Sequence, residues 1–306
     1  MTKRLVLKVD VDTLRGTVEG VPNLLSLFDK LGIRATFLFS LGPDHTGRAI
    51  KRMFRPGFFA KVQRTSVLEH YGLKTLMYGT LLPGPDIGKR CAAILRGVRT
   101  AGHETGIHTW DHVLWQDHMR SEDEHWIRRQ MQLAFDRFYK IFRCSPQTHG
   151  AAGWQMNESA LRQLDDWKIP YASDGRGGHP FRPIVGGAVS NCVQLPTTLP
   201  TLDELIGVEI NGAPLDAQGA ARHLLAKTSV SDASQVFTLH SELEGAKLRP
   251  AFETLLHGWR EQGFILSSMQ DYYRQLLTDA VPVPPRRVAW GTVPGRSGEL
   301  MVALAP

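Results

Sequence analysis

The segment Leu5-Val-Leu-Lys-Val-Asp-Val-Asp12 places two carboxylates at the end of an apolar run close to the N-terminus. Residues 5–11 are typical of a buried strand, and side chains two positions apart on a strand face the same way. We therefore predict that Asp10 and Asp12 point into one space, with Cβ atoms roughly 6–7 Å apart. At that separation one carboxylate can bind a metal ion while the other contacts a water molecule beside it.

A second segment, His108-Thr-Trp-Asp-His112, carries two histidines four residues apart. In an extended chain these would lie about 13 Å from each other, which is too far for two metal–nitrogen bonds of about 2.0–2.1 Å. On a helix, residues i and i+4 share a face. If both imidazoles bind one ion, the spacing predicts a helical turn over residues 108–112.

Each motif has an ordinary alternative. An Asp-x-Asp at a strand end is often a turn or a helix cap, and a chain with twelve histidines contains such His spacings by chance. The context favours a site, because Gly102-His-Glu-Thr-Gly-Ile107 leads into the first histidine and Phe237-Thr-Leu-His240 ends a later apolar run. Together these segments predict one metal site. Two imidazoles and one carboxylate also describe the iron site of some oxygenases, so the residues leave the metal's identity open.

The composition is ordinary for a globular protein. Of 306 residues, 42% are hydrophobic and 22% charged, and no run approaches the roughly 20 apolar residues of a membrane-spanning helix. The first residues lack the apolar stretch of a secretory signal, so we expect a cytoplasmic protein. Three widely spaced cysteines argue against both a disulfide framework and a thiolate zinc site. The net charge of +6 indicates an anionic partner: nucleic acid, an acidic membrane or a phosphorylated substrate.

Apolar runs alternate with amphipathic stretches along the chain, which is typical of β/α units that build a parallel sheet. The candidate chemical residues follow predicted strands, and in a parallel barrel the active site lies at the carboxyl ends of the strands. We therefore predict one α/β domain over residues 1–275, folded as an open, irregular barrel. Residues 276–306 are rich in proline and predict a loosely packed or disordered extension.

Residues 44–86 form an insertion whose first part is basic and amphipathic. Between His45 and Leu68 there is no acidic residue. Cations beside aromatic residues favour helices that lie in a membrane interface and meet anionic headgroups; the alternative is a hairpin that packs its apolar side on the barrel. Nothing else resembles a base-reading module, so we expect no nucleic acid partner. The proposed membrane contacts are Arg48, Lys51, Arg52, Phe54, Arg55, Phe58 and Phe59.

The motifs taken in order are similar to those of one known family. An Asp-x-Asp strand, a Gly-His-Glu-x-Gly-x-His-Thr-x-x-His segment and a late Leu-x-His resemble the polysaccharide deacetylase family (NodB homology, carbohydrate esterase 4) over roughly residues 4–270. Within it, longer stretches resemble the 4-deoxy-4-formamido-L-arabinose-phosphoundecaprenol deformylases of lipid A modification. The resemblance implies a distorted (β/α)7 barrel. The longer stretches are Val9–Thr13, Glu19–Pro22, Ser40–Asp44, Gly150–Trp154, Ser173–Gly177, Pro180–Pro183 and Leu239–Gly245.

The resemblance also implies a role for each chemical residue. Asp12, His108 and His112 would bind one divalent metal ion, for which we expect zinc, with manganese, cobalt or nickel as alternatives. Asp10 would be the general base that takes a proton from the attacking water. His240 would be the general acid that protonates the leaving amine.

The chain departs from the family in its third motif, where Gly150 and Ala152 stand in place of an arginine and a proline that relatives commonly carry. The usual arginine–aspartate pair that orients the catalytic groups is therefore in question. We expect Asp174 to be the orienting aspartate unless it is a turn residue, and Arg176 to replace the arginine. The missing side chains would open space for a different acyl sugar, and Trp154 would stack on its ring unless it belongs to the core.

Four neighbouring residues are expected to act indirectly. His103 and Glu104 would support the metal ligands rather than bind the ion. Glu242 and Glu244 would contact the developing cation of the amino sugar or remain solvated. A backbone N–H within residues 150–153 would help to hold the oxyanion.

The implied function is hydrolysis of the formamide in undecaprenyl phosphate-linked 4-deoxy-4-formamido-L-arabinose to the amino sugar and formate, for lipid A modification and resistance to cationic peptides such as polymyxin. The expected partners are that lipid-linked sugar and anionic lipids at the cytoplasmic face of the inner membrane, with no obligate protein partner. Two alternatives stay open. One is another reaction of the family, either N-deacetylation of a polysaccharide or peptidoglycan or opening of a cyclic amide. The other is a non-catalytic membrane-surface binding protein on the same fold.

Overall fold

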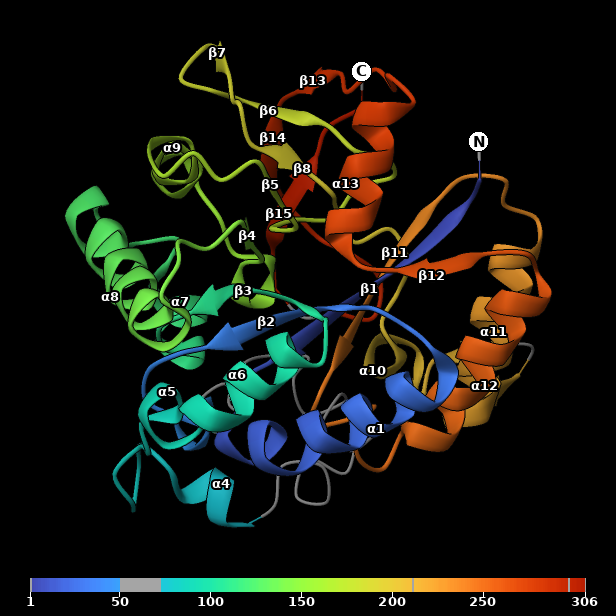
Figure 1. Ribbon diagram of the computed structural model, residues 1–306, viewed down its shortest axis with the longest axis horizontal. Coiled ribbons are helices and arrows are strands. Elements are labelled where there is room, and N and C mark those ends of the chain that lie inside the picture. The colour runs from blue at the N-terminus through green and yellow to red at the C-terminus, as the bar shows by residue number, and fades with distance from the viewer. Residues whose placement is uncertain (1, 50–72, 211, 297, 306) are drawn as a thin grey trace.

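A computed structural model of the protein describes residues 2–49, 73–210, 212–296 and 298–305. Within these ranges, parallel strands form one main sheet in the order β11-β1-β2-β3-β4-β5-β8, and β12 also pairs with β1 (Figure 1). The expected distorted (β/α)7 barrel is confirmed, as an incomplete barrel. Its strands are β1 (Arg4–Val11), β2 (Thr36–Ser40), β3 (Glu104–Thr109), β4 (Thr148–His149), β5 (Tyr171–Ala172), β8 (Val193–Gln194), β11 (Gln235–His240) and β12 (Ile265–Ser267).

The central strand is β1, whose side chains alternate between two environments. Leu5, Leu7 and Val9 belong to the main hydrophobic cluster together with residues of the surrounding helices. The residues between them lie on the opposite, inner face of the sheet, where the Lys8 ammonium lies 5.2 Å from the centre of the Trp154 ring. A period of two explains why Asp10 shares this inner side.

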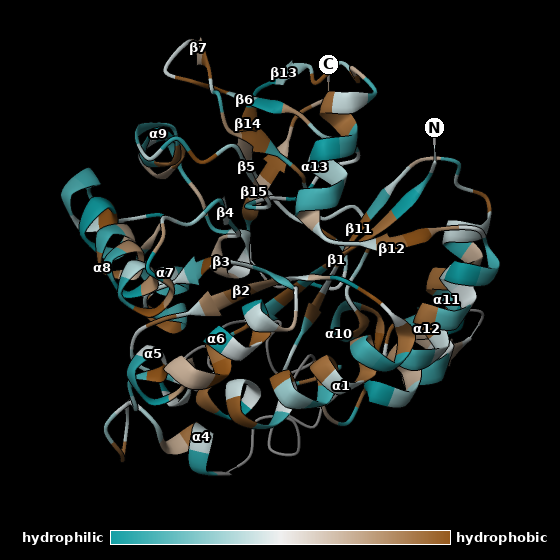
Figure 2. Ribbon diagram, viewed as in Figure 1, coloured by the Kyte–Doolittle hydropathy of each residue, from teal (hydrophilic) through white to brown (hydrophobic). Residues whose placement is uncertain are grey.

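Helices pack around the outer side of the sheet (Figure 1). Figure 2 shows that the central strands are mostly hydrophobic, whereas the helices mix hydrophobic and hydrophilic residues, as expected of elements with one face in the core. The helices are α1 (Val21–Leu31), α4 (Leu73–Met77), α5 (Ile87–Arg90), α6 (Ala92–Thr100), α7 (His112–His118), α8 (Glu124–Phe142), α9 (Glu158–Asp166), α10 (Leu202–Leu205), α11 (Ala217–Ser229), α12 (Arg249–Glu261) and α13 (Met269–Thr278), with a π turn η1 (Gly16–Gly20) and a 3-10 turn η3 (Ala152–Trp154).

Short strands outside the main sheet form smaller ladders. β6 pairs with both β7 and β13, β9 pairs with β10, and β14 pairs with β15. Their bounds are β6 (Arg182–Val185), β7 (Ala188–Val189), β9 (Glu209–Ile210), β10 (Ala213–Pro214), β13 (Pro285–Arg286), β14 (Val288–Gly291) and β15 (Leu300–Ala303).

The loosely packed extension predicted for residues 276–306 is wrong for the residues that are described. The boundary expected after residue 275 falls inside α13, and β14 and β15 form an antiparallel hairpin. Met301 is only 2% exposed, and its carbonyl accepts a hydrogen bond from the Arg176 N–H at 2.9 Å. Proline content did not reveal this packing, because the partner residues lie more than a hundred positions earlier in the chain.

Of the insertion expected at residues 44–86, residues 50–72 lie outside the described parts of the chain. The described remainder contains α4 and leads into α5, which Asp86 caps by accepting a hydrogen bond from the Lys89 N–H. Arg48 donates to the carbonyl of Gly79 at 3.0 Å. The other proposed membrane contacts fall outside the described residues: Lys51, Arg52, Phe54, Arg55, Phe58 and Phe59.

Two expectations from composition can be compared with the described residues. No helix among them is both long and apolar enough to cross a membrane. The three cysteines are all free, as their odd number and wide spacing predicted.

Candidate metal centre

Three side chains meet at the carboxyl end of the sheet and could hold one metal ion. Asp12, His108 and His112 each offer a ligand atom, and these atoms all lie within 4.8 Å of one another. Asp12 Oδ1 is 3.1 Å from His108 Nε2, and Asp12 Oδ2 is 3.3 Å from His112 Nε2. Asp12 and His108 are buried and His112 is partly exposed, so the group lies at the edge of the interior.

The two histidines come together differently from the helical turn predicted over residues 108–112. His108 lies near the end of β3, and His112 is the first residue of α7. Between them, the Asp111 side chain caps α7 by accepting a hydrogen bond from the Leu114 N–H at 3.1 Å. The turn from strand to helix still brings the ring centres to 5.3 Å. The pairing was therefore right and the local conformation wrong.

The donor set fits a divalent cation. His108 Nδ1 lies 2.5 Å from the carbonyl oxygen of Gly150, which can only accept, so Nδ1 carries the hydrogen and a neutral ring has its lone pair on Nε2. That Nε2 faces Asp12 Oδ1, an atom with no hydrogen bond in the described structure. Two lone pairs at 3.1 Å repel each other unless a positive charge lies beside them. A metal ion would supply that charge, with Gly150 fixing the ring orientation.

The pKa values of Asp12 and His108 show the same electrostatic coupling. Burial alone would raise the pKa of Asp12, but His112, His108 and His240 outweigh burial and hold that pKa well below its usual range. Burial would likewise lower the pKa of His108, yet Asp10 and Asp12 raise it above its ordinary value. The site therefore favours a charged Asp12 and a positive charge beside it, whether from a proton or from a metal.

Asp10 and His240 flank the trio from neighbouring strands. They are direct partners in the parallel ladder between β1 and β11. Asp10 is 3% exposed, and its Oδ1 lies 3.8 Å from His108 Nδ1 and has no hydrogen bond among the described residues. His240 Nδ1 is also buried without a hydrogen-bond partner there. As predicted, Asp10 and Asp12 face one space, because both contact His108.

Glu242 holds the loop that carries Asp12. Its Oε1 accepts hydrogen bonds from the backbone N–H groups of Asp12 at 3.0 Å and Thr13 at 2.7 Å, and from the Thr13 hydroxyl at 2.8 Å. Burial and the nearby Asp12 raise the pKa of Glu242 to about 8. A Cβ on Gly16 would lie 2.1 Å from the same carboxylate oxygen, so this position has no room for a side chain. The sequence offered only the closeness of Glu242 to His240 as a signal.

Glu244 supports the backbone of His240. Its Oε2 accepts a hydrogen bond from the His240 N–H at 2.8 Å, and burial raises the pKa of its carboxyl to about 8. Both Glu242 and Glu244 are buried. The expectation that they contact the sugar or stay solvated is therefore wrong, since both bind the backbone of the loops that carry Asp12 and His240.

Asp174 anchors the loop after β4. Its Oδ1 accepts hydrogen bonds from His149 Nδ1 at 2.6 Å and from the Ala151 N–H at 2.9 Å, and its Oδ2 accepts from Gln194 Nε2 at 2.9 Å. Burial would raise the pKa of Asp174, but His149 and these bonds keep it below its ordinary value. The loop fixed in this way presents the Gly150 carbonyl to His108. Asp174 is therefore bonded to the loop whose Gly150 carbonyl contacts His108, and its orienting role stays a prediction.

The expectation that Arg176 replaces the missing arginine is wrong. Arg176 Nη1 pairs with Glu204 at 2.8 Å, and its Nη2 donates to the carbonyl of Leu199. Its guanidinium also lies 5.0 Å from the centre of the Trp154 ring. The cation beside Asp10 is Lys8, whose Nζ is 3.2 Å from Asp10 Oδ2.

Trp154 belongs to the core rather than to an open sugar-binding surface. It is 1% exposed, its Nε1 donates to Thr197 Oγ1 at 3.0 Å, and the guanidinium of Arg296 lies 4.2 Å from its ring centre. The alternative of a core residue therefore fits, and stacking on a sugar ring does not fit this conformation.

His103 and Glu104 lie at the opposite end of β3 from His108, so they do not support the metal ligands as expected. His103 Nδ1 accepts from the Ala35 N–H at 3.2 Å, and burial lowers its pKa to about 4. Glu104 binds the Thr36 hydroxyl at 2.5 Å and the Gln270 N–H at 2.9 Å. Its hydrogen bonds join α13 to the N-terminal ends of β2 and β3.

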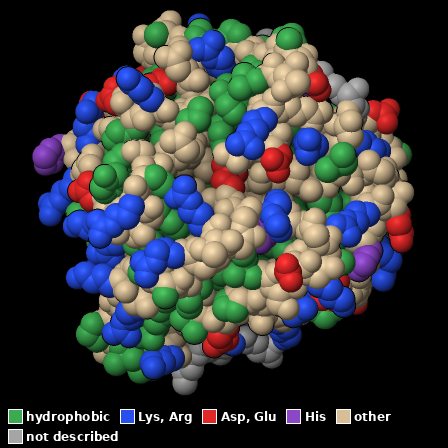
Figure 3. All heavy atoms as spheres, viewed as in Figure 1, with side chains coloured by type: hydrophobic (Ala, Val, Ile, Leu, Met, Phe, Trp, Pro, Cys, Tyr) green, Lys and Arg blue, Asp and Glu red, His purple; other side chains and the backbone are tan. Residues whose placement is uncertain are grey.

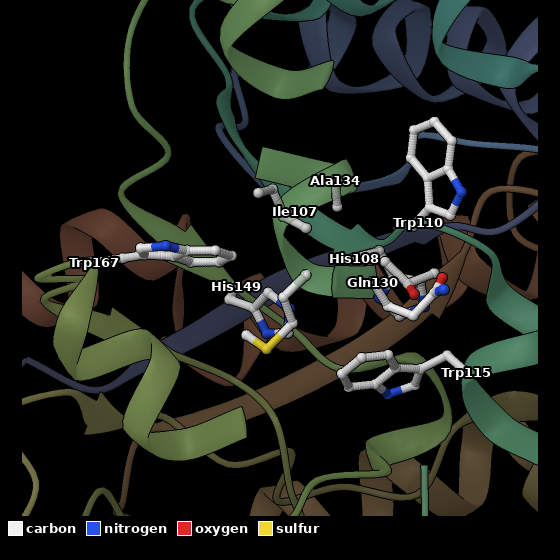
Figure 4. A pocket seen from close by; sticks show the side chains of 10 residues that line it. Ile107, His108, Trp110, Trp115, Gln130, Ala134, His149 and Trp167 are labelled. Atoms are coloured by element: carbon white, nitrogen blue, oxygen red, sulfur yellow. The ribbon is translucent and has the colours of Figure 1, made fainter. Parts of the chain in front are cut away.

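A small pocket lies on the α8 side of β3 (Figure 4). Of the three candidate ligands, only His108 lines it, and neither Asp10 nor His240 does. His149 and Trp115 point into the same space in Figure 4. The pocket therefore lies beside His108 alone among these ligands, and Asp10 and His240 do not line it.

Comparisons with known proteins agree with this geometry. The family model described as polysaccharide deacetylase matches residues 2–172. A protein of Shewanella sediminis named as a probable 4-deoxy-4-formamido-L-arabinose-phosphoundecaprenol deformylase is 40% identical over 82% of this chain and 79% of its own length. A protein of Wigglesworthia glossinidia brevipalpis with the same name is 32% identical over 92% of this chain and 96% of its own length.

Solved structures show the same fold at low sequence identity. A putative polysaccharide deacetylase from Mycobacterium smegmatis superposes with a TM-score of 0.62 at 16% identity, over 95% of this chain and 96% of its own. A family 4 acetyl xylan esterase from Clostridium thermocellum, solved with a cobalt ion, has a TM-score of 0.52 at 14% identity, over 92% and 93% of the two chains. On the extent of the family match and the identity to these relatives, the chain belongs to the polysaccharide deacetylase family.

Proposed function

We propose that this protein is a metal-dependent deformylase that hydrolyses the formamide of undecaprenyl phosphate-linked 4-deoxy-4-formamido-L-arabinose to the amino sugar and formate. The observation that carries the proposal is the 40% identity, over 82% of the chain, to a relative named for this activity. The candidate metal trio with Asp10 and His240 beside it supplies the groups that amide hydrolysis needs. In the cell the product would serve lipid A modification and resistance to cationic peptides such as polymyxin.

The proposed chemistry divides the proton transfers between two strands. Asp10 removes a proton from water as the oxygen attacks the formyl carbon, and no hydrogen bond of its Oδ1 among the described residues competes with this step. His240 gives a proton to the nitrogen as the C–N bond breaks, so that a neutral amine and formic acid leave, and the formic acid loses its remaining proton to water to become formate. The ladder that pairs Asp10 with His240 keeps the two groups on the same side of the sheet.

Asp12, His108 and His112 would hold a divalent ion, for which we propose zinc. Such an ion would polarise the formyl carbonyl and lower the pKa of a water molecule. Within the loop of residues 150–153, the N–H groups of Gly150 and Ala151 already donate to Ile107 and Asp174. A backbone donor for the oxyanion would therefore come from residue 152 or 153.

The activity is tested by incubating the purified protein with the lipid-linked formamido sugar. We expect formate release that a chelator abolishes and that zinc restores, because the site needs its metal to react. The control is the same lipid-linked sugar with an acetamido group in place of the formamido group, from which hydrolysis would release acetate. Acetate release at an equal or higher rate, with little formate, would replace the proposal with a deacetylase.

We also propose that the protein binds the surface of the inner membrane from the cytoplasmic side, where its substrate's isoprenoid tail is anchored. Figure 3 shows Lys and Arg side chains gathered on the side of the molecule where α5 and α8 lie in Figure 1. The described part of the insertion, which contains Arg48, leads directly into α5. Exposed cations on α5, α6 and the end of α8 are Lys89, Arg90, Arg96, Arg99, Lys140 and Arg143.

Charge reversal in the insertion should strongly reduce binding to vesicles. Wild-type protein is expected to co-sediment with liposomes that contain anionic lipid, less so as salt rises. Changing Arg48, Lys51, Arg52 and Arg55 to glutamate should remove most of this binding. The matched control changes four exposed cations elsewhere, Arg222, Lys227, Arg274 and Arg287, to glutamate. Equal loss in both variants would show a dependence on net charge alone and would refute a specific role of the insertion.

A further inference from the structure

We infer that Lys8 is a positioning residue for Asp10, an inference that rests on the proposed role of Asp10 as the general base. Lys8 lies in the middle of the central strand β1, on the inner side, and is 0% exposed. Lysine is almost never fully buried without a partner, because removing its charge from water is energetically costly. A buried lysine two residues before Asp10 therefore calls for a specific role.

The ion pair holds one oxygen of Asp10 and leaves the other without a hydrogen bond among the described residues. Lys8 Nζ lies 3.2 Å from Asp10 Oδ2. Neither Lys8 Nζ nor Asp10 Oδ1 has a hydrogen bond within the described residues. Attraction to Lys8 therefore fixes the rotation of the Asp10 carboxylate without occupying Oδ1, which is the oxygen on the side of His108.

The surrounding residues fit a lysine at this position closely. A Cβ on Gly150 would lie 2.9 Å from Lys8 Cε and 2.3 Å from Leu38 Cδ1. The Trp154 ring lies on another side of the ammonium, with its centre at 5.2 Å, and a cation is attracted to such a ring. The absence of a side chain at Gly150 thus makes room for the charge that contacts Asp10.

Burial decides how Lys8 acts. Its Nζ is inaccessible to solvent and its side chain is 0% exposed, whereas the Asp10 side chain is 4% exposed, so the little surface that the pair has belongs to Asp10. A direct role of Lys8 in binding the sugar or the oxyanion is therefore excluded in this conformation. Its effect on the reaction must pass through Asp10.

The test is a double-mutant cycle between Lys8→Met and Asp10→Asn, measured as formate release with the metal-loaded enzyme. Methionine keeps the length of the side chain and removes its charge. We expect Lys8→Met to lower kcat by roughly ten- to a hundredfold, the effect of a misplaced catalytic group, with KM and metal content within about twofold of wild type. In the Asp10→Asn background, Lys8→Met should change kcat by less than about twofold, because the group it positions is gone.

Three results would overturn the inference: an unchanged kcat in Lys8→Met, an equal loss of kcat in both backgrounds, or loss of the metal. If Lys8→Met does not fold, Lys8→Gln is judged by the same criteria. A crystal structure of the Lys8 variant gives a readout that needs no substrate, since an Asp10 carboxylate in its original orientation would also refute a positioning role. Failure of the wild type to release formate would refute the deformylase instead, and the crystal structure would still decide the role of Lys8.

Discussion

Asp12→Ala is expected to lose its metal and to lower formate release by at least about a thousandfold. Asp12 is the only residue of the trio that contacts both imidazoles, through Oδ1 to His108 and Oδ2 to His112. Changes to residues that merely support metal ligands cost about 10- to 100-fold in affinity or activity, so removal of the bridging ligand should cost more. His108→Ala should have the same effect, because it removes the imidazole that Gly150 orients.

Metal content and thermal stability give the measurement. Zinc should raise the melting temperature of the wild type, since a ligand that binds only the folded state stabilises it, and should leave that of Asp12→Ala unchanged. His118→Ala is the control, because this half-exposed histidine lies at the other end of α7 and pairs with Glu122. Stoichiometric zinc in Asp12→Ala would move the metal site elsewhere.

Asp10→Asn and His240→Ala should each lower kcat by about 10²- to 10⁴-fold, the usual contribution of general acid–base catalysis, while metal content stays at the wild-type level. Asn keeps the shape of Asp10 and removes its ability to take a proton. Neither residue belongs to the trio whose ligand atoms lie within 4.8 Å. Each change should also remove one limb of a bell-shaped dependence of kcat/KM on pH.

The two variants are distinguished by rate and metal measurements made on the same samples. A loss of zinc in His240→Ala would reassign His240 as a metal ligand, and full activity in either variant would remove that residue from the mechanism. Glu253→Gln on the outer helix α12 is a suitable control, since this carboxylate forms only an exposed pair with Arg249 among the described contacts and should leave both measurements unchanged.

The sequence predicted those parts of the site that follow from a local period. Asp10 and Asp12 share a side because a strand alternates with a period of two, and His240 was placed correctly because it ends a strand of the same sheet. The helical turn over residues 108–112 was wrong because the spacing of four was interpreted without Asp111. An aspartate directly before an amphipathic stretch is a helix cap, and this would have placed His112 at the start of a helix.

The contacts that the sequence did not predict all join distant segments. Arg176 binds Glu204 rather than taking the place of the missing arginine, and Trp154 is covered by Arg296 from the C-terminal hairpin. In the sequence, Lys8 is a single polar residue in an apolar strand. Its contact with Asp10 depends on the space left at Gly150, which only the folded structure reveals. Such pairings are set by the packing of the whole sheet and leave no local period to detect.

The central place of β1 has a consequence for the synthesis of the chain. Its partner strand β11 pairs with it across 230 residues, the separation of the bond from the Arg4 N–H to Ser234, and β12 lies farther along the chain. At roughly 5–20 residues per second, the ribosome needs roughly 10–50 seconds to supply them. Throughout that interval the nascent protein presents an apolar strand with one unsatisfied edge, which is a template for aggregation, so the emerging polypeptide is a natural client for chaperones.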